Sequence, residues 1–229
     1  SWPKSAVQTP LNRGDGQEPQ FAYGYGLSYA DNGNLSKLSE ASGLTGADTS
    51  QDLTLFDSRP MDPWHWILGD ASERAKEVTS SDERLDTIRL RAIDRQVQED
   101  SVQVSWLSEG PARVALSAIE RSDLSDYLQA DAALVMDLRL DQAPEADVLV
   151  GMGCGQDCAA QVDITEALSG RPLGEWQEFS IELACFDQET MDLSMVLEPF
   201  SLTTDAPLTL SLHHLRVVSE ARAKFQCGD

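Results

Sequence analysis

From residue 53 onward the chain repeats one pattern, in which short apolar or alternating segments end at Gly, Pro, Asp or Ser. A period of two places successive side chains on opposite faces of a β-strand, and these turn residues let the chain reverse. Helical pattern is confined to one or two turns in 163–170 and in 123–129. Many short strands with few helices predict a mainly β fold, an antiparallel β-sandwich. The predicted strands are 53–56, 64–68, 86–94, 101–107, 112–119, 133–140, 147–153, 176–183, 200–204 and 208–218.

Alternation also predicts which side chains face the core. Along 101–107, Val102, Val104 and Trp106 share one face, so Trp106 is expected in the core. Along 176–183 the inward residues are Phe179, Ile181 and Leu183, whereas Trp176 shares the other face with Glu178, Ser180 and Glu182. Trp64, Trp66 and Leu68 share a face in the same way.

The first 51 residues have a different character. Residues 1–30 are rich in Pro, Gly and aromatic side chains and show little periodicity. Residues 31–51 are polar and small, which predicts a linker with one helical turn at 35–40. The chain starts with SWPKS and no initiator Met, so we expect a processed or truncated piece of a longer protein.

Charge and hydropathy exclude several partners. A net charge of −22 favours solubility and argues against nucleic acid or an anionic membrane as a partner. No apolar run is long enough to span a bilayer, and no signal-peptide pattern opens the chain.

Four cysteines are present, and two of them lie in a Gly-rich turn, GMGCGQDCAA. Such a loop meets the geometric limits for a bridge, so a Cys154–Cys158 disulfide is predicted, which implies an oxidising compartment. Cys185 follows an apolar strand and is expected to be a buried thiol, and Cys227 lies on the polar tail. No second pair completes a structural metal site.

Two motifs near the start resemble the end of the second, α/β-sandwich domain of glycoside hydrolase family 3. In that family a Trp-Pro-Lys-Ser-like run leads to Pro-Leu-Asn and then to a closing motif similar to PFGYGLSY. The resemblance covers about the first 30 residues and implies that they are the tail of that domain. The matching residues are Trp2, Pro3, Lys4, Ser5, Pro10, Leu11, Asn12, Tyr23, Gly24, Tyr25, Gly26, Leu27, Ser28 and Tyr29.

The remainder resembles the extra C-terminal domain of some bacterial members, of the exo-1,3/1,4-β-glucanase or glucan glucohydrolase type. The stretches that carry this resemblance include RPMDPWHWILGD, GCGQDCAAQVDITEAL and GEWQEFSIELACF. It implies a galactose-binding-like, jelly-roll β-sandwich, in agreement with the strand pattern.

The resemblance also implies where catalysis takes place. A retaining glycosidase needs two carboxyl groups, and in this family both would precede Ser1, so the fragment itself is expected to be non-catalytic. The acidic residues here predict a solvated surface. Asp-rich segments at 123–126 and 187–192 could supply oxygen ligands to calcium, although neither has EF-hand spacing. No other cofactor is indicated.

Sugar recognition would require exposed aromatic side chains with a few polar groups. The candidates are Trp64, Trp176 and Trp66, with a core position favoured for Trp66. If they are instead buried, the domain would have a structural role.

Together these observations predict a tail of an α/β-sandwich domain at 1–30, a linker at 31–51, an accessory β-sandwich at 52–220 and a C-terminal tail at 221–229. The expected setting is a periplasmic or secreted bacterial enzyme that releases glucose from β-glucans. A role in supporting the catalytic domains of the same polypeptide is favoured, and an independent module that binds β-glucan or cello-oligosaccharide is the alternative.

Overall fold

The computed structural model describes residues 27–29, 35–38, 52–70, 75–187, 189–221, 225 and 227. The chain divides into two compact units, Ser1–Thr45 and Gly46–Asp229. In the first unit the described backbone forms an antiparallel pair, β1 (Leu27–Tyr29) and β2 (Leu35–Leu38). The helical turn predicted at 35–40 is therefore wrong for Leu35–Leu38. Asn32 and Gly33, which lie between the strands in sequence, are typical hairpin-turn residues.

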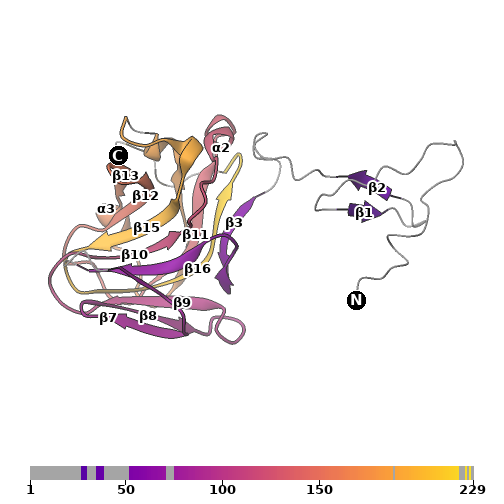
Figure 1. Ribbon diagram of the computed structural model, residues 1–229. Coiled ribbons are helices and arrows are strands. Elements are labelled where there is room, and N and C mark those ends of the chain that lie inside the picture. The colour runs from indigo at the N-terminus through magenta and orange to yellow at the C-terminus, as the bar shows by residue number, and fades with distance from the viewer. Residues whose placement is uncertain are drawn as a thin grey trace, which may run out of the picture. The chain divides into compact units, whose positions relative to one another are not determined.

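The second unit contains two antiparallel sheets that face each other (Figure 1). The first sheet has the order β13-β12-β15-β10-β5-β6. Its strands are β5 (His65–Gly69), β6 (Ala75–Glu77), β10 (Ala112–Ser117), β12 (Leu149–Gly155), β13 (Cys158–Asp163) and β15 (Glu198–Thr204).

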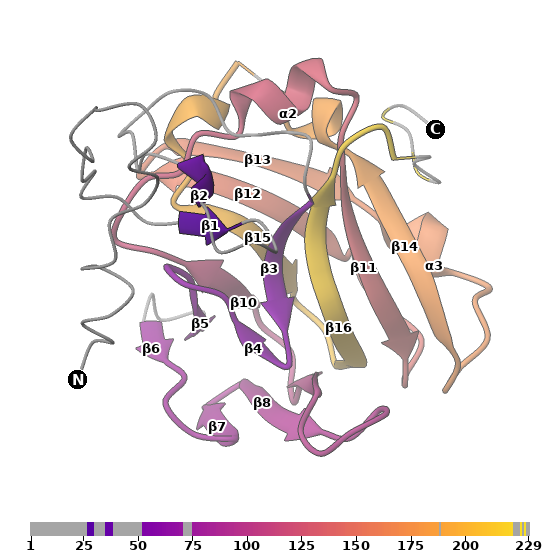
Figure 2. The ribbon, with the colours of Figure 1, turned by 90° about the vertical axis from the view of Figure 1, so that its right-hand side faces the viewer.

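The second sheet has the order β14-β11-β16-β9-β8-β7, and β3 pairs with β16 and with β4. In Figure 2 its strands β14, β11, β16 and β3 lie next to one another. The strands are β3 (Leu53–Asp57), β4 (Arg59–Pro60), β7 (Asp82–Leu85), β8 (Ile88–Ile93), β9 (Ser101–Trp106), β11 (Ala133–Leu140), β14 (Trp176–Glu182) and β16 (Leu208–Val218).

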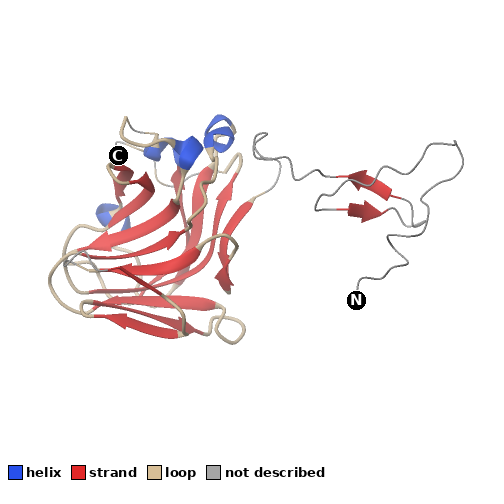
Figure 3. Ribbon diagram, in the orientation of Figure 1, coloured by secondary structure: helices blue, strands red, loops and turns tan. Residues whose placement is uncertain are grey.

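Helices are short, as Figure 3 shows, and the predicted mainly β sandwich is confirmed. Both predicted helical segments are present, as α2 (Ser125–Gln129) and α3 (Thr165–Leu168). Two 3₁₀ turns, η1 (Leu183–Phe186) and η2 (Leu193–Met195), complete the unit. Among the described residues, no helix has the length and apolar character needed to cross a membrane.

The core fills the space between the sheets with large apolar side chains. Phe56 of β3 contacts Trp66 of β5 edge to face at 5.4 Å, and Trp66 contacts Phe200 of β15 at 6.2 Å. Aromatic pairs in this geometry add stability beyond the burial of their area. The inward positions expected from alternation are confirmed, because Trp106 and Phe179 are buried.

A β-bridge, a ring contact and a disulfide connect the C-terminal segment to the sandwich. Phe225 forms a bridge with Ile181 of β14, and its ring lies 6.4 Å from that of Phe179. Cys185 in η1 forms a disulfide with Cys227, with 5.3 Å between the Cα atoms. The prediction of a free buried thiol at Cys185 is therefore wrong, because the tail returns to this turn.

Candidate functional site

Polar side chains form a continuous line across the second sheet, which we call the polar row. Trp176 on β14 lies opposite Arg139 on β11, and Arg139 lies opposite Ser211 on β16. Ser211 lies opposite Gln103 on β9, and Gln103 lies opposite Arg91 on β8. Directly opposed residues point to the same side of a sheet, so these five side chains share one face.

The alternate residues explain why this face is the outer one. On the same strands, Leu138, Leu210, Val104 and Phe179 are buried among the core residues. Because side chains alternate along a strand, their neighbours must point away from the core. The polar row is therefore the reverse side of a well-packed sheet, and its backbone positions are rigidly supported.

Asp141, directly after β11, connects the centre of the polar row. It accepts hydrogen bonds from Arg139 Nε at 2.7 Å, Ser211 Oγ at 2.7 Å and Gln103 Nε2 at 2.9 Å. Burial alone would raise the pKa of Asp141, but these hydrogen bonds outweigh it and hold the pKa below its ordinary value. The carboxylate is therefore ionised at neutral pH, and it orients three donors from three strands.

Trp176, at one end of the polar row, is half-buried and contacts two cations. The guanidinium of Arg95 lies 4.7 Å from the centre of the ring, and that of Arg139 lies 5.2 Å from it. His213 of β16 contacts the same ring edge to face at 6.3 Å. Arg95 also pairs with Asp137 of β11, and each of these two side chains is 19% exposed. A ligand at Trp176 would thus meet an aromatic surface bordered by donors and acceptors.

The loop between β8 and β9 places Arg95 over Trp176. The buried carboxylate of Asp100 accepts hydrogen bonds from the backbone N–H groups of Arg95 at 2.6 Å, Gln96 at 2.9 Å and Val97 at 3.1 Å. His213 Nδ1 lies 2.7 Å from the carbonyl oxygen of Asp100. A carbonyl oxygen can only accept a hydrogen bond, so His213 Nδ1 carries a hydrogen and is the donor.

Burial alone would raise the pKa of Asp100, but the backbone hydrogen bonds lower it to about 2. The pKa of Asp100 in the folded state lies below the unfolded value of 3.8. The ionised carboxylate therefore stabilises the fold at pH values above 3.8. The contribution is lost as the pH falls through the folded pKa and amounts to at most about 2 kcal/mol.

We therefore expect Asp100→Asn to remove part of the acid sensitivity of the fold. Urea unfolding of the wild type should show a falling free energy between about pH 5 and about pH 2, and the variant should show a shallower fall. Asp52→Asn, at an exposed position, is the control and should follow the wild type. If the free energy of unfolding fell equally steeply with decreasing pH in all three proteins, this role for Asp100 would be contradicted.

The tryptophans predicted from the sequence lie in different places. Trp176 belongs to the polar row, whereas Trp64 and Trp66 are 6% and 3% exposed and lie among the core residues. Neither of these two rings can be the exposed stacking surface considered from the sequence. Both do line a cavity at the edge of the sandwich.

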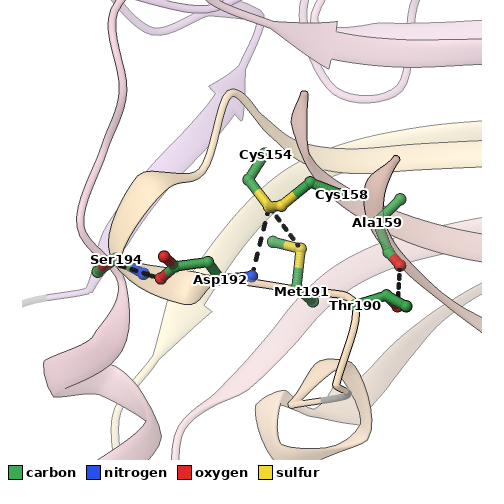
Figure 4. The surroundings of a disulfide bond; sticks show 7 residues. All are labelled: Cys154, Cys158, Ala159, Thr190, Met191, Asp192 and Ser194. Atoms are coloured by element: carbon green, nitrogen blue, oxygen red, sulfur yellow. Dashed lines mark hydrogen bonds between the residues drawn. A yellow bond between two sulfur atoms is a disulfide. The ribbon is translucent and has the colours of Figure 1, made fainter. Parts of the chain in front are cut away.

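Cys154 and Cys158 form a disulfide in the β12–β13 hairpin, with 5.1 Å between the Cα atoms (Figure 4). Met191 Sδ lies 3.6 Å from Cys154 Sγ, and the backbone N–H of Asp192 donates to the same sulfur at 3.3 Å. These contacts attach the hairpin to the η2 segment, which indicates a structural role.

The segments considered for calcium use carboxylates in local turns. Asp123 accepts from the N–H and the hydroxyl of Ser125, and Asp192 does the same with Ser194. Within the part of the chain that the structure describes, no group of three or more His, Cys, Asp or Glu side chains could hold a metal ion.

Sequence reasoning missed most of the polar row. Only Trp176 was considered. The other four members, Arg139, Ser211, Gln103 and Arg91, were missed, and so were Asp141 and Arg95 beside the row. The available signal was the set of polar residues at alternate positions of otherwise apolar strands, such as Gln103 between Val102 and Val104.

Comparison with known proteins agrees with this fold. The family model Exop_C, described as galactose-binding domain-like, matches residues 62–217. No curated protein sequence matches the chain.

Solved structures with the same fold include the exo-1,3/1,4-β-glucanase ExoP of a Pseudoalteromonas species, at 23% identity and a TM-score of 0.63. That match covers 99% of this chain and 27% of the glucanase, so the chain spans about a quarter of that protein's length. The extra C-terminal domain of ExoP, solved separately, matches at 16% identity and a TM-score of 0.61, over 77% of this chain and 98% of that domain.

A third structure is the family 30 carbohydrate-binding module of the cellulosomal cellulase Cel9D-Cel44B of Clostridium thermocellum. It matches at 15% identity and a TM-score of 0.54, over 75% of this chain and 99% of that module.

Proposed function

Because this chain belongs to the Exop_C family of galactose-binding domain-like proteins, we propose that it is a non-catalytic accessory domain whose polar row binds β-glucan. The observation that carries the proposal is the row itself, which places an aromatic ring, two guanidinium groups and an amide on one sheet face, while the buried hydroxyl of Ser211 holds Asp141 in place beneath them.

The chemistry of the polar row fits a neutral sugar chain. A pyranose ring offers an apolar face for Trp176 and hydroxyl groups that both donate and accept, which Arg139, Gln103 and Asp141 can meet. Strands lie about 4.8 Å apart, so five strands from β14 to β8 present about 19 Å of surface. This length suits several linked rings better than one.

Charge balance supports the same class of ligand. Arg95 and Arg139 are each paired with a carboxylate, Asp137 and Asp141 respectively. These two pairs cancel the positive charge beside Trp176. At the other guanidinium of the row, Arg91, which donates to Gln103 Oε1 at 2.9 Å, the net charge of the chain, −22, opposes an anionic ligand such as a phosphate or sulfate group. A neutral glycan avoids both penalties.

A structural role beside the catalytic domains of the same polypeptide is the second candidate. It is favoured by the contacts at Trp176, because two guanidinium groups already occupy positions near its ring. If those arginines cannot yield to a sugar, the same side chains would instead support a neighbouring domain.

The wider context is part of the proposal. We infer that the parent protein is a family 3 exo-β-glucanase or β-glucosidase, and the motif resemblance within residues 1–30 supports this inference. A periplasmic or secreted location is supported by the two disulfides, which persist in oxidising compartments.

Calorimetric titration of the chain with a soluble mixed-linkage β-glucan tests the proposed role of the polar row. We expect Trp176→Ala and Arg139→Ala each to weaken binding by about tenfold, which corresponds to about 1.4 kcal/mol. The cause is the loss of the stacking ring in the first variant and of a hydroxyl-binding donor in the second.

Arg113→Ala is the matched control, because Arg113 forms a similar pair with Glu198 on the other sheet at 2.6 Å. This variant should bind like the wild type. An equal loss of glucan affinity in Trp176→Ala, Arg139→Ala and Arg113→Ala would contradict a sugar site at the polar row. The absence of glucan binding by the wild type would contradict it as well. The structural role would be favoured by two results together: the wild-type chain binds no glucan, and Trp176→Ala lowers the stability of the full-length enzyme.

A further inference from the structure

Two adjacent histidines of β16, His213 and His214, both lie on the outer face of the second sheet. On a regular strand adjacent side chains point to opposite faces, so one of the two would enter the core. Neither does, because the buried apolar residues of β16 change from even to odd positions at the histidines. These buried residues are Leu208, Leu210 and Leu212 before the pair, and Leu215 and Val217 after it.

A β-bulge in β16 causes this change of face. Asp137 of β11 lies opposite His213, but Val135, two positions away on β11, lies opposite Arg216, three positions away on β16. The extra residue on β16 is accommodated with His214 in the left-handed backbone region, at a φ of 48°. Bulges often redirect a side chain at a functional site, and Figure 2 shows this one on a strand between β11 and β3.

The redirected His214 ring contacts Arg216. Arg216 Nη1 lies 3.1 Å from His214 Nδ1 and donates to the carbonyl oxygen of His214 at 3.3 Å. A guanidinium can only donate, so His214 Nδ1 accepts and the ring is neutral, with its hydrogen on Nε2. Arg216 Nη2 donates at 3.1 Å to Glu178 on the edge strand β14. A line of contacts therefore runs from the bulge across β11 to β14.

A proton on His214 Nδ1 breaks this line. The nitrogen loses its lone pair, so it can no longer accept from Arg216. The imidazolium also places a second positive charge beside a guanidinium that is only 17% exposed, and like charges at such a position repel. Arg216 must then move away from the ring, while the charged ring is attracted to the carboxylates of Asp57 on β3 and Asp137 on β11.

Charged groups on every strand near the bulge act on His214, either directly or through a partner. Burial has the largest effect and lowers the pKa of His214 below its ordinary value of 6.5. The charge of Arg216 lowers this pKa further, and the two nearby carboxylates oppose the decrease. The groups are Arg216 and His213 on β16, Asp57 on β3, Asp137 on β11, Glu178 on β14 and Arg95 in the β8–β9 loop.

We propose that His214 is a pH-sensitive switch that controls how Arg216 supports the edge strand β14. At neutral pH the His214 ring accepts from Arg216 and keeps the guanidinium against Glu178. In mildly acidic solution the ring takes up a proton, Arg216 leaves it, and β14 loses this support two residues from Trp176. The switch requires no ligand at the polar row, so it goes beyond the proposed function and is tested independently of it.

The direction of the effect on stability follows from proton linkage. The unfolded chain takes up the histidine proton near pH 6.5, whereas the folded chain takes it up only at a lower pH. The free energy of unfolding therefore falls as the pH decreases from 6.5 through the folded pKa of His214. This window lies above the one expected for Asp100, so the two effects can be measured separately.

NMR titration of the wild-type chain from pH 7.5 to pH 5 is the test. We expect the His214 ring to titrate in a one-proton step with a midpoint below pH 6.5. The Nε–H resonance of Arg216, assigned by its loss in Arg216→Lys, should shift with the same midpoint. The Nε–H resonance of Arg113, which pairs with Glu198 on the other sheet, should stay in place.

His214→Asn removes the titrating ring, and asparagine adopts left-handed backbone more readily than most residues. In this variant the shift of the Arg216 resonance should be lost, and the melting temperature should fall less between pH 7 and pH 5.5 than in the wild type. His65→Asn is the matched control, because His65 lies on β5 of the other sheet. It should show the same Arg216 shift as the wild type.

Two results would overturn the proposal. The first is an Arg216 resonance that stays fixed in the wild type while the His214 ring titrates, and this measurement needs no variant to fold. The second is an Arg216 shift of the same size and midpoint in His214→Asn. Neither result bears on glucan binding, so failure of the switch and failure of the proposed function are distinguishable.

Discussion

Replacing Cys185 and Cys227 together by alanine is expected to lower the free energy of unfolding by about 4 kcal/mol. This disulfide spans a sequence separation of 42 residues, so it removes a large loop-closure entropy from the unfolded chain. It also attaches the C-terminal segment, including Phe225, beside Phe179 of β14. Urea unfolding without reducing agent measures the effect.

The Cys154–Cys158 pair provides the matched control, because its sequence separation is only 4. The same chain-entropy estimate gives about 2 kcal/mol for the corresponding double alanine variant. The difference between the two variants is therefore the informative quantity. A larger loss for the short loop than for the long one would contradict the entropic explanation.

Phe200→Ala is expected to cost about 3–5 kcal/mol, through lost burial and the cavity that remains. Phe200 is fully buried on β15, a strand paired on both sides, and its ring contacts Trp66. Because β15 is hydrogen-bonded to a strand on each side, it cannot easily move inward to fill the cavity that the missing ring leaves. Denaturant unfolding should show a lower midpoint with an unchanged slope.

Ile119→Ala is the control for this substitution, since Ile119 is 94% exposed. Its free energy of unfolding should stay within about 0.5 kcal/mol of the wild type. A comparable loss in both variants would show that Phe200 is not part of a rigid core.

The strands were predictable because alternation is a local property. Segment 101–107 carries the period of two through Val102, Val104 and Trp106 and corresponds to β9. Segment 208–218 carries it from Leu208 to Leu212 and corresponds to β16. The strands missed from the sequence are β1, β4, β6, β7 and β13. The first four have two to four residues each, too few to show a period, and β13 has only Ala160 and Val162 as buried positions. The interpretation of Leu35–Leu38 as a helical turn failed because pairing with β1 decided the conformation.

The polar row was not predictable for a different reason. Its members are far apart in the sequence, at Arg91, Gln103, Arg139, Trp176 and Ser211, and they meet only through the order and register of five strands. Alternation shows that Gln103 points outward, but it does not show which side chain lies opposite. The Cys185–Cys227 disulfide was missed for the same reason, because it depends on the return of the C-terminal segment.

The indole N–H resonances in ¹H–¹⁵N spectra of the chain test the central claim most directly. The chain has five tryptophans, of which Trp176 is in the polar row, Trp106 is in the core and Trp2 lies outside the described residues. Addition of long mixed-linkage β-glucan oligosaccharides should shift the Trp176 resonance in a saturable way and leave that of Trp106 in place. An unchanged Trp176 resonance at saturating glucan would contradict the assignment of the polar row as a β-glucan site.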